Sequence, residues 1–395
     1  MLAVGLMSGT SLDGIDAALV EVTGVDESTD VRLRSFETLP MPTGTRKRIE
    51  FACDPEKSSS QLLCSLNFEL GHLFSHAVGK VCASAGVIDS GLAFVASHGQ
   101  TVWHEPYPPE GWHAGTLQLG EAAVIAREHG VCVVSDFRKA DMAAEGQGAL
   151  LVPFSEQILY GDPKRNVALL NLGGIGNVTV LPHGDASGIF AFDTGPGNMM
   201  VDEACRHLFG IPFDKGGAIA RRGNVHEGLL DTLMENPFLA KEPPKSTGRE
   251  VFGPEAVDRL LASYLDLAPA DIVRTLAEFT SASVVDACTR YVEPRVHGRI
   301  DRLVIGGGGA HNQTILDSIA RRIPQTEVMT QERLGFSSDA KEAVAFAILG
   351  NQTLHGKPSN VPTATGAAGP AVLGSITLPP QGWTHAIKAC VRGLG

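Results

Sequence analysis

The chain has 395 residues, of which 43% are hydrophobic, and this length and composition suit two or three domains with sizeable cores. The formal net charge of −12 at pH 7 argues against a surface for nucleic acid or an anionic membrane, because such surfaces are rich in Lys and Arg. No run of 18 apolar residues predicts a membrane span, and no basic segment precedes the first apolar run, so we expect a cytoplasmic protein without a signal peptide.

Two apolar segments at the start of the chain, residues 2–7 and 15–22, flank a loop rich in Gly, Ser, Thr and Asp. The segments are typical of strands, and the loop from Ser8 to Gly14 has the residues that tolerate positive φ and form turn hydrogen bonds. Such a hairpin directs backbone N–H groups and hydroxyls at an anion. A single glycine loop fits an ordinary turn equally well.

The rest of the first half alternates predicted strands and helices. Strands are predicted over 31–39, 93–97 and 131–135, and helices over 58–85 and 120–129. A proline-rich loop is predicted over 106–111. Residues 141–153 contain Glu145-Gly-Gln-Gly148 and are predicted to cross between domains.

The second half repeats the opening pattern. Residues 166–172 run into Gly173-Gly-Ile-Gly-Asn177 and a further strand over 178–181, and a third glycine loop at 304–312 follows another apolar strand. This recurrence favours two duplicated α/β domains with a nucleotide between them. Helices are then predicted over 199–209 and 340–349, a helical insertion over 229–276, and a Pro- and Gly-rich return to the first domain over 356–374.

Other site types fail on spacing. The chain has no G-x-x-x-x-G-K-[ST], and Lys245-Ser-Thr-Gly248 has its glycine on the wrong side of the lysine. Gly174-Ile-Gly176 lacks the third glycine and the helix of a dinucleotide site. His72 and His76 lack the glutamate of H-E-x-x-H, so we expect them to pack or to lie on a solvated helix edge. The seven cysteines form no C-x-x-C pair, so we expect reduced thiols.

Several motifs together closely resemble the anhydro-N-acetylmuramic acid kinase family. They are Gly5 to Asp16, Ser97-His-Gly-Gln-Thr101, Asp136-Phe-Arg138, Gly146-Gln-Gly148, Asn171 to Asn177, Phe192-Asp-Thr-Gly-Pro-Gly-Asn198, Pro244-Lys-Ser-Thr-Gly-Arg-Glu250 and Gly306-Gly-Gly-Gly-Ala310. The resemblance runs in order from Gly5 to about Gly374. Two departures are Leu150, where the family usually has proline, and Glu145 before the glycine.

The resemblance implies an α/β fold of two ribonuclease-H-like domains, as in the acetate and sugar kinases, Hsc70 and actin, with ATP in the cleft between them. Domain I is expected to comprise residues 1–137 and 362–395, and domain II residues 138–361 with the helical insertion. The implied reaction is ATP-dependent opening of the 1,6-anhydro ring of 1,6-anhydro-N-acetylmuramic acid, with phosphorylation of O6. The product, N-acetylmuramic acid 6-phosphate, belongs to peptidoglycan recycling and amino-sugar metabolism.

Asp193 matches the carboxylate base that this reaction needs to activate water. It is predicted to end the apolar strand 189–192 and open a glycine turn, which would direct it into a cleft; an Asx-turn role is the alternative. Pro244 to Glu250 is a family signature for which the sequence supplies no role.

The resemblance also assigns the binding residues. The predicted ATP-binding residues are Gly9, Thr10, Ser11, Leu12, Asp13, Gly14, Ile15, Asp16, Gly173, Gly174, Gly307, Gly308 and Gly309. Asp13 or Asp16 would steer Mg²⁺ through water, since Mg²⁺ gives up its waters reluctantly. The predicted sugar-binding residues are His98, Gln100, Arg138 and Glu342, for which strand-end hydrogen bonding or helix-end charge stabilisation is the alternative.

Two other functions stay open from the sequence: a different sugar or acetate kinase of the same superfamily, and an ATP-binding regulator without catalysis. The presence of Asp193 counts against the regulator. We expect a small-molecule substrate and neither nucleic acid nor membrane as partner. The oligomeric state is open, a homodimer included.

Overall fold

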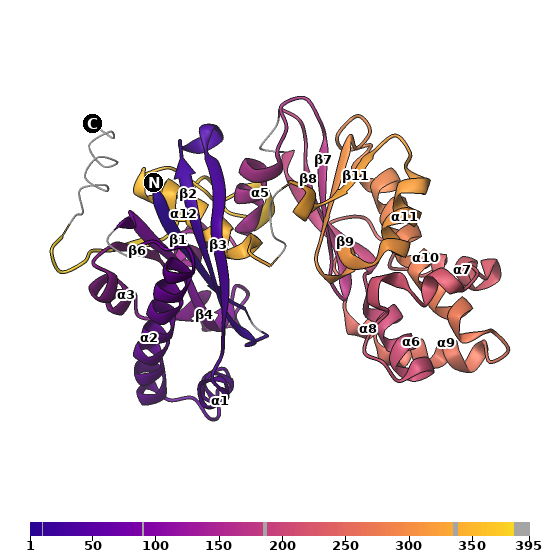
Figure 1. The fold of residues 1–395 in the computed structure, drawn as a ribbon, viewed down its shortest axis with the longest axis horizontal. Helices are drawn as coiled ribbons and strands as arrows, with labels where there is room; N and C mark the ends of the chain where they lie inside the picture. The colour runs from indigo at the N-terminus through magenta and orange to yellow at the C-terminus, as the bar shows by residue number, and fades with distance from the viewer. Residues whose placement is uncertain (10, 89–90, 185–187, 335–338, 383–395) are drawn as a thin grey trace. The chain divides into compact units, whose positions relative to one another are not determined.

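The computed structural model describes residues 1–395 apart from 10, 89–90, 185–187, 335–338 and 383–395. The chain forms two compact units, one of Met1–Tyr160 with Asp339–Gly395 and one of Gly161–Ser338. Each unit has its own β-sheet (Figure 1). No helix in the described ranges has both the length and the apolar character needed to cross a bilayer.

The first unit contains a seven-stranded sheet in the order β12-β6-β4-β1-β2-β3, with β5 paired to β4. β1, β2 and β3 form an antiparallel meander, and β4 and β6 continue the sheet in parallel with β1. The strands are β1 (Leu2–Ser8), β2 (Gly14–Thr23), β3 (Asp30–Pro40), β4 (Phe94–Glu105), β5 (Gly115–Leu119), β6 (Cys132–Ser135) and β12 (Ser375–Thr377).

The second unit repeats this plan in a five-stranded sheet of order β11-β10-β7-β8-β9. β7, β8 and β9 are antiparallel, whereas β10 and β11 run parallel to β7. The strands are β7 (Val167–Leu172), β8 (Ile175–Leu181), β9 (Phe190–Pro196), β10 (Arg302–Gly306) and β11 (Glu327–Thr330).

In both sheets a meander of three strands is extended by two strands parallel to its first strand. If these five strands of each sheet are numbered along the chain, their order across the sheet is 3-2-1-4-5. This is the ribonuclease-H-like arrangement. The prediction of two similar α/β domains is therefore confirmed by strand order and direction, which the three glycine loops could only suggest.

Helices cover both faces of the first sheet, and a separate apolar cluster fills each side. The helices of this unit are α1 (Thr43–Ala52), α2 (Ser60–Ser84), α3 (Ala122–His129), α4 (Phe137–Ala143), α5 (Val152–Tyr160), α12 (Lys341–Leu354) and α13 (Pro362–Thr365), with the 3-10 turn η1 (Asp26–Ser28). α12 packs against β1, β2 and β4. The fit is close, because a Cβ on Gly5 would lie 1.8 Å from the carbonyl oxygen of Ala343.

The packing of α12 places residues that the sequence assigned to domain II in the first unit. The chain enters the second unit after Tyr160, not within 141–153, and returns after Ser338. Residues 138–160 and 339–361 thus belong to the first unit, because α5 and α12 bury their apolar side chains on the first sheet. The return that we predicted over 356–374 therefore occurs earlier, and residues 356–374 lie within the first unit, followed by β12, which pairs with β6.

In the second unit, helices pack around α10, and one apolar cluster joins them to the sheet. The elements are α6 (Met199–Phe209), η4 (Lys215–Gly217), η5 (Ala220–Arg222), α7 (Glu227–Met234), α8 (Arg249–Phe252), α9 (Pro254–Ser263), α10 (Pro269–Ala287), the π-helical η6 (Cys288–Val292), η7 (Gly308–His311), α11 (Gln313–Arg322) and η8 (Gln331–Leu334). The expected insertion over 229–276 is helical.

The segment between α4 and α5 contains the two departures from the family pattern. Glu145 and Leu150 both adopt positive φ, 67° and 57° respectively. Proline is held near φ −65° and cannot adopt this conformation. The backbone at Leu150 must therefore differ from that of a relative with proline there.

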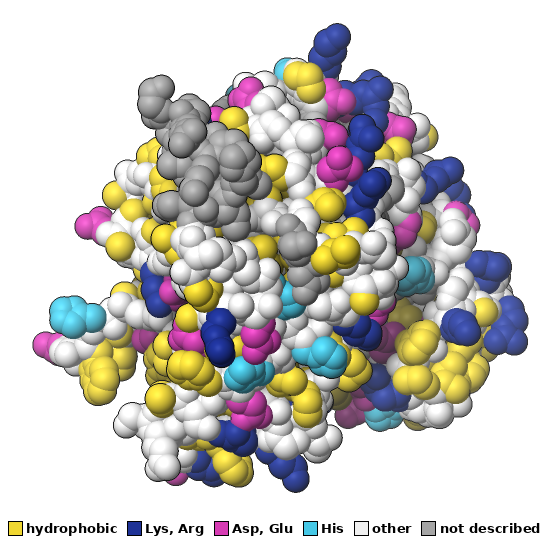
Figure 2. Space-filling view, turned by 60° about the vertical axis from the view of Figure 1, so that its left-hand side comes forward, with side chains coloured by type: hydrophobic (Ala, Val, Ile, Leu, Met, Phe, Trp, Pro, Cys, Tyr) yellow, Lys and Arg dark blue, Asp and Glu magenta, His cyan; other side chains and the backbone are white. Residues whose placement is uncertain are grey.

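Charged side chains of both signs are interspersed on the face shown in Figure 2. Acidic groups lie among the Lys and Arg side chains, so the cations on this face do not form one continuous basic surface.

Candidate active site

The loop between β1 and β2 is braced by Gln100 of β4. Gln100 Oε1 accepts a hydrogen bond from Ser8 Oγ at 2.6 Å, and Gln100 Nε2 donates to the carbonyl oxygens of Gly9 at 3.4 Å and Thr101 at 3.1 Å. Both ends of the amide are thereby engaged. Gln100, predicted to contact sugar, has a structural role in holding the loop.

The same loop leaves space beside Gly9. Among the described residues, and apart from its chain neighbours, the one atom within 4 Å of a Cβ placed on Gly9 would be Ser11 Oγ, at 3.7 Å. We expected the glycines of this loop to adopt positive φ, but Gly9 and Gly14 do not. The residue with positive φ is Leu12, at 56°. An open backbone approach suits a phosphate group. Thr10, a predicted ATP-binding residue, lies outside the described residues.

His98, buried within β4, pairs with the partly buried Arg138 of α4. His98 Nδ1 lies 2.9 Å from the carbonyl oxygen of Gly99, which can only accept, so Nδ1 carries the proton. Nε2 then accepts from Arg138 Nε at 2.9 Å, while Arg138 Nη1 donates to the carbonyl oxygen of Gly148 at 2.7 Å. Burial, and then the charge of Arg138, lower the pKa of His98 to about 3, so the ring is neutral near pH 7.

Glu342, in the first turn of α12, belongs to the same electrostatic neighbourhood. Burial raises its pKa, the charge of Asp16 adds to this rise, and Lys341 and Arg138 oppose it. Burial also lowers the pKa of Arg138, and Glu342 opposes that change. Three residues predicted separately, Asp16, Arg138 and Glu342, thus interact in one unit.

Asp16 and Asp13 are the carboxylates of the first hairpin. Asp16 Oδ1 accepts from Thr38 Oγ1 at 2.6 Å; burial raises the pKa of Asp16, and this hydrogen bond partly offsets the rise. No group of three or more His, Cys, Asp or Glu suited to a metal ion occurs within the described ranges. Mg²⁺ is often held by one or two carboxylates plus phosphates and water, so a single hairpin carboxylate, Asp13 or Asp16, is compatible with an ion that arrives with ATP.

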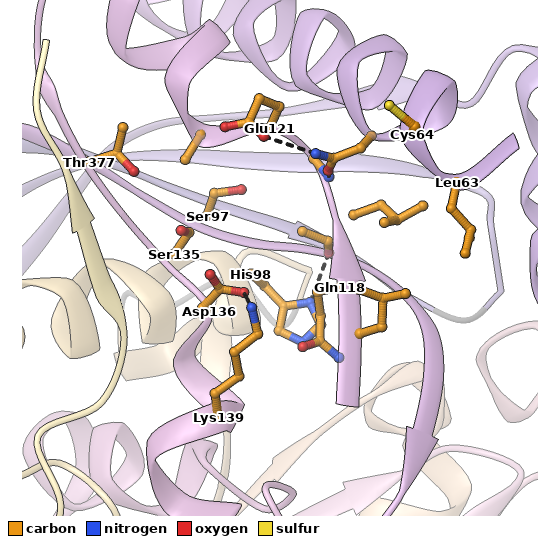
Figure 3. Close-up of a pocket in the computed structure, with 16 residues that line it drawn as sticks. Leu63, Cys64, Ser97, His98, Gln118, Glu121, Ser135, Asp136, Lys139 and Thr377 are labelled. Atoms are coloured by element: carbon orange, nitrogen blue, oxygen red, sulfur yellow. Dashed lines mark hydrogen bonds and ion pairs between the residues drawn. The ribbon is translucent and has the colours of Figure 1, made fainter. Parts of the chain in front are cut away.

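A polar cavity of about 400 Å³ opens beside His98 in the first unit (Figure 3). Its polar lining includes Ser97 and Gln118, and within the described part of the chain the buried atoms Ser97 Oγ and Gln118 Oε1 have no hydrogen-bond partner. Asp136 and Lys139 pair at its edge, at 2.5 Å. The sequence drew attention to two motifs that build this cavity, 97–101 and 136–138, but not to Gln118 or Lys139.

In the second unit, three glycine segments meet at the carboxyl ends of β7, β9 and β10. The carbonyl oxygen of Gly173 accepts from Asn198 N at 2.8 Å, and that of Gly174 accepts from Gly197 N at 2.9 Å. Gly307 adopts φ 79°, and a Cβ there would lie 2.5 Å from Asn171 Oδ1. Ligands of α/β sheets usually bind at this edge, so the predicted grouping of these loops is supported within this unit.

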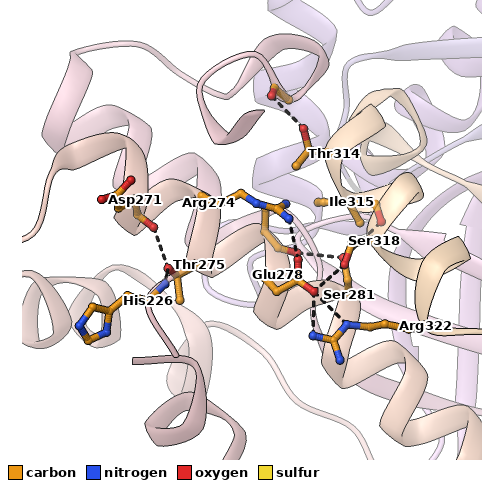
Figure 4. Close-up of polar contacts among 12 residues, drawn as sticks. His226, Asp271, Arg274, Thr275, Glu278, Ser281, Thr314, Ile315, Ser318 and Arg322 are labelled. Atoms are coloured by element: carbon orange, nitrogen blue, oxygen red, sulfur yellow. Dashed lines mark hydrogen bonds and ion pairs between the residues drawn. The ribbon is translucent and has the colours of Figure 1, made fainter. Parts of the chain in front are cut away.

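An ionic network centred on the buried Glu278 joins α10 to α11, the helix after the third glycine loop (Figure 4). Glu278 Oε1 accepts from Ser318 Oγ at 2.6 Å and from Arg322 Nε at 2.9 Å, and Oε2 lies 3.0 Å from Arg274 Nη2. Burial alone would raise the pKa of Glu278, but these hydrogen bonds and charges lower it. The network fixes α11, which follows directly after the loop.

Asp193 lies within β9 and not at its end, which corrects our prediction. The strand continues to Pro196 because the register shifts between Gly176 and Asn177, so pairing with β8 resumes beyond Asp193. Asp193 Oδ1 accepts from Asn177 Nδ2 at 2.9 Å, and Oδ2 accepts from Thr247 N at 2.9 Å. The carboxylate is thus held by one donor on each oxygen.

Comparison with known proteins identifies the family. The sequence profile of the anhydro-N-acetylmuramic acid kinase family matches residues 1–379. The chain is 48% identical over 383 residues to the anhydro-N-acetylmuramic acid kinase of Clostridioides difficile (strain 630), covering 97% of this chain and 100% of that protein. The corresponding protein of Bacillus cereus (strain Q1) is 47% identical over 382 residues, covering 96% and 100%. The chain belongs to the anhydro-N-acetylmuramic acid kinase family.

This membership confirms the family and the kinase activity that the motifs predicted. Among solved structures, component A of the (R)-2-hydroxyglutaryl-CoA dehydratase of Acidaminococcus fermentans has a TM-score of 0.45 and 11% identity, covering 88% of this chain and 96% of that one. The roles of individual residues in this member of the anhydro-N-acetylmuramic acid kinase family remain predictions, as does the position of ATP.

Proposed function

We propose that this protein uses ATP to phosphorylate O6 of 1,6-anhydro-N-acetylmuramic acid while water opens the anhydro ring. The products are N-acetylmuramic acid 6-phosphate and ADP. The observation that carries the proposal is the Asp193 carboxylate, fixed by Asn177 and Thr247 within a chain that matches the family along almost its whole length.

Asp193 is the general base of this proposal. One of its oxygens takes a proton from water as the water oxygen bonds to C1 of the sugar. The C1–O6 bond breaks and leaves its electron pair on O6, which bonds to the γ-phosphorus as the bond to the β-phosphate oxygen breaks. Each Asp193 oxygen keeps lone pairs beyond the hydrogen bond it accepts, so the side chain can be oriented and still receive the proton.

The ATP phosphates are assigned to the loop that Gln100 braces and to the loops around Gly173 and Gly307. Open backbone at Gly9 and φ 79° at Gly307 support this assignment. Asp13 and Asp16 would hold Mg²⁺, mostly through water, and the ion would neutralise phosphate charge when bound.

For the sugar, Arg138 is the contact that we favour. Both ring nitrogens of His98 are engaged, so His98 orients Arg138 and has no free ring nitrogen to hydrogen-bond the substrate. Arg138 retains donors on Nη2 for an anionic group such as the lactyl carboxylate. Ser97 Oγ and Gln118 Oε1, which lack partners within the described residues, would hydrogen-bond polar groups of the sugar in the cavity of Figure 3.

The test is to incubate the pure protein with ATP, Mg²⁺ and 1,6-anhydro-N-acetylmuramic acid and to measure ADP and the sugar phosphate. We expect ADP and N-acetylmuramic acid 6-phosphate in equal amounts. N-acetylglucosamine and acetate serve as control acceptors for the other sugar or acetate kinases of the superfamily. Turnover of a control acceptor alone, or ATP binding without turnover of any acceptor, would contradict the proposal.

We also propose a cytoplasmic location, since ATP is available there and Cys53, Cys64, Cys205 and Cys288 of the described residues form no disulfide. Cell fractionation tests this. A homodimer is one oligomeric state to check by light scattering.

A further inference from the structure

Lys245, in the family signature to which the sequence assigned no role, is a buried cation. The residue is 7% exposed. Nζ donates to the carbonyl oxygens of Leu239 at 2.9 Å and Phe238 at 3.4 Å. Burial lowers the pKa of Lys245, and Asp286 opposes the change.

Three aromatic rings surround the same ammonium group. Nζ lies 4.3 Å from the ring centroid of Tyr291, 4.9 Å from that of Phe238 and 5.9 Å from that of Phe192. An ammonium within about 6 Å of a ring centroid is attracted by the face of the ring, more strongly when it is removed from water. Tyr291 Oη also donates to Leu239 O at 2.8 Å, so the cage and the carbonyls form one network.

The backbone that carries Lys245 makes direct contact with the proposed base. Asp193 N donates to Lys245 O at 3.0 Å, and Thr247 N donates to Asp193 Oδ2 at 2.9 Å. The residue before Asp193 is Phe192, one wall of the cage. The segment 245–247 therefore holds Asp193 at both its amide and its carboxylate, and the Lys245 ammonium anchors this segment.

We propose that Lys245 is a positioning residue for Asp193: its caged ammonium fixes the 245–247 backbone so that Thr247 N–H orients the carboxylate toward the attacking water. This inference rests on the proposed function of Asp193 as base. Lysine suits the role because its compact ammonium has three donors, so it can bond two carbonyls while facing aromatic rings.

The test compares Lys245→Met, which keeps the length of the side chain and removes the ammonium, with Lys241→Met. Lys241 is exposed and also faces the Phe238 ring, at 6.0 Å, which makes it a matched control. We expect Lys245→Met to lower kcat about 10- to 100-fold, as misplacement of a reacting group does, with KM for ATP and sugar unchanged. Lys241→Met is expected to match the wild type.

A double-mutant cycle separates positioning from simple loss of structure. If Lys245 acts through Asp193, adding Lys245→Met to Asp193→Asn slows single-turnover phosphorylation no further. If Lys245→Met slows Asp193→Asn by the same factor by which it slows the wild type, the inference is overturned. An unchanged kcat in Lys245→Met would overturn it as well. Inactive wild-type protein would instead contradict the proposed function.

A second variant covers the case in which Lys245→Met does not fold. Phe238→Leu keeps an apolar side chain but removes one ring of the cage. We expect a smaller loss of kcat with unchanged KM, again absent in the Asp193→Asn background. The inference would be overturned if Lys245→Met does not fold and folded Phe238→Leu has an unchanged kcat. Lys245 would then serve folding alone.

Discussion

Arg138 Nε donates a hydrogen bond to His98 Nε2 at 2.9 Å, and this contact fixes the protonation state of the histidine. The bond requires an unprotonated Nε2, and the carbonyl oxygen of Gly99 requires a protonated Nδ1. A neutral His98 therefore supports the position of Arg138 without adding a second positive charge beside it.

The first prediction concerns stability at low pH. The ordinary His pKa is 6.5, and burial lowers that of His98 to about 3. Between these values the unfolded chain binds a proton that the folded protein does not, so the free energy of unfolding falls as pH decreases from 6.5 toward 3. The slope for one proton approaches about 1.4 kcal/mol per pH unit. We expect His98→Gln to have a shallower pH dependence, measured by urea unfolding at several pH values.

His113→Gln is the control, because His113 is exposed. Its pH dependence is expected to match the wild type. The same slope in His98→Gln and wild type would show that His98 is not the buried neutral group described above.

The second prediction separates ligand contact from packing at two glycines of the first strand and loop. Gly9→Val adds a side chain where the protein leaves space, whereas Gly5→Val places one against Ala343 O. We expect Gly9→Val to retain the wild-type Tm but to raise KM for ATP or abolish turnover, and Gly5→Val to unfold. Thermal melts and ATP titrations check this. Normal kinetics in Gly9→Val would show that the loop is an ordinary turn and does not bind ATP.

The third prediction follows from the assignment of Asp193 as base. Asp193→Asn keeps the shape of the side chain but cannot take the proton, so kcat is expected to fall by about 10² to 10⁴. The variant is expected to fold and to bind ATP. Coupled ADP assays and nucleotide binding measure the two quantities, and near wild-type kcat would rule out Asp193 as the base.

The fourth prediction concerns the stereochemistry of the same step. Because O6 leaves from the β face of C1, water must arrive from the opposite face, and the first product is expected to be the α anomer. Oxygen from H₂¹⁸O is expected at C1 and not in the phosphate. Rapid NMR and mass spectrometry check both, and an initial β anomer would contradict direct attack by water.

The fifth prediction concerns Leu150, where the family usually has proline. Leu150→Pro restores the family residue yet is expected to lower the free energy of unfolding by more than about 1 kcal/mol, because proline cannot adopt φ 57°. Leu150→Asn is the control, since asparagine tolerates positive φ. Greater stability in Leu150→Pro would show that this loop has the backbone of its relatives.

Local patterns were sufficient for much of the fold. The long helix predicted over 58–85 is α2, Ser60–Ser84, and the first hairpin follows from two apolar runs around a glycine loop. These elements depend on neighbours a few residues apart, so their signal is present in the sequence. β5 was missed, because its pairing with β4 depends on the partner strand as much as on its own residues.

The sequence by itself therefore determined the hairpins, the helices α2, α3, α6 and α12, the glycine loops and the family. Tertiary structure decided which sheet α12 joins, that Asp193 lies inside β9, and that Lys245 anchors it across 52 positions of chain, from 193 to 245. The physical reason is that a strand register or a buried ammonium is stabilised by groups brought together only on folding. A lysine within Pro244 to Glu250 carries no sign in its own neighbours that three aromatic rings and two carbonyls will enclose it.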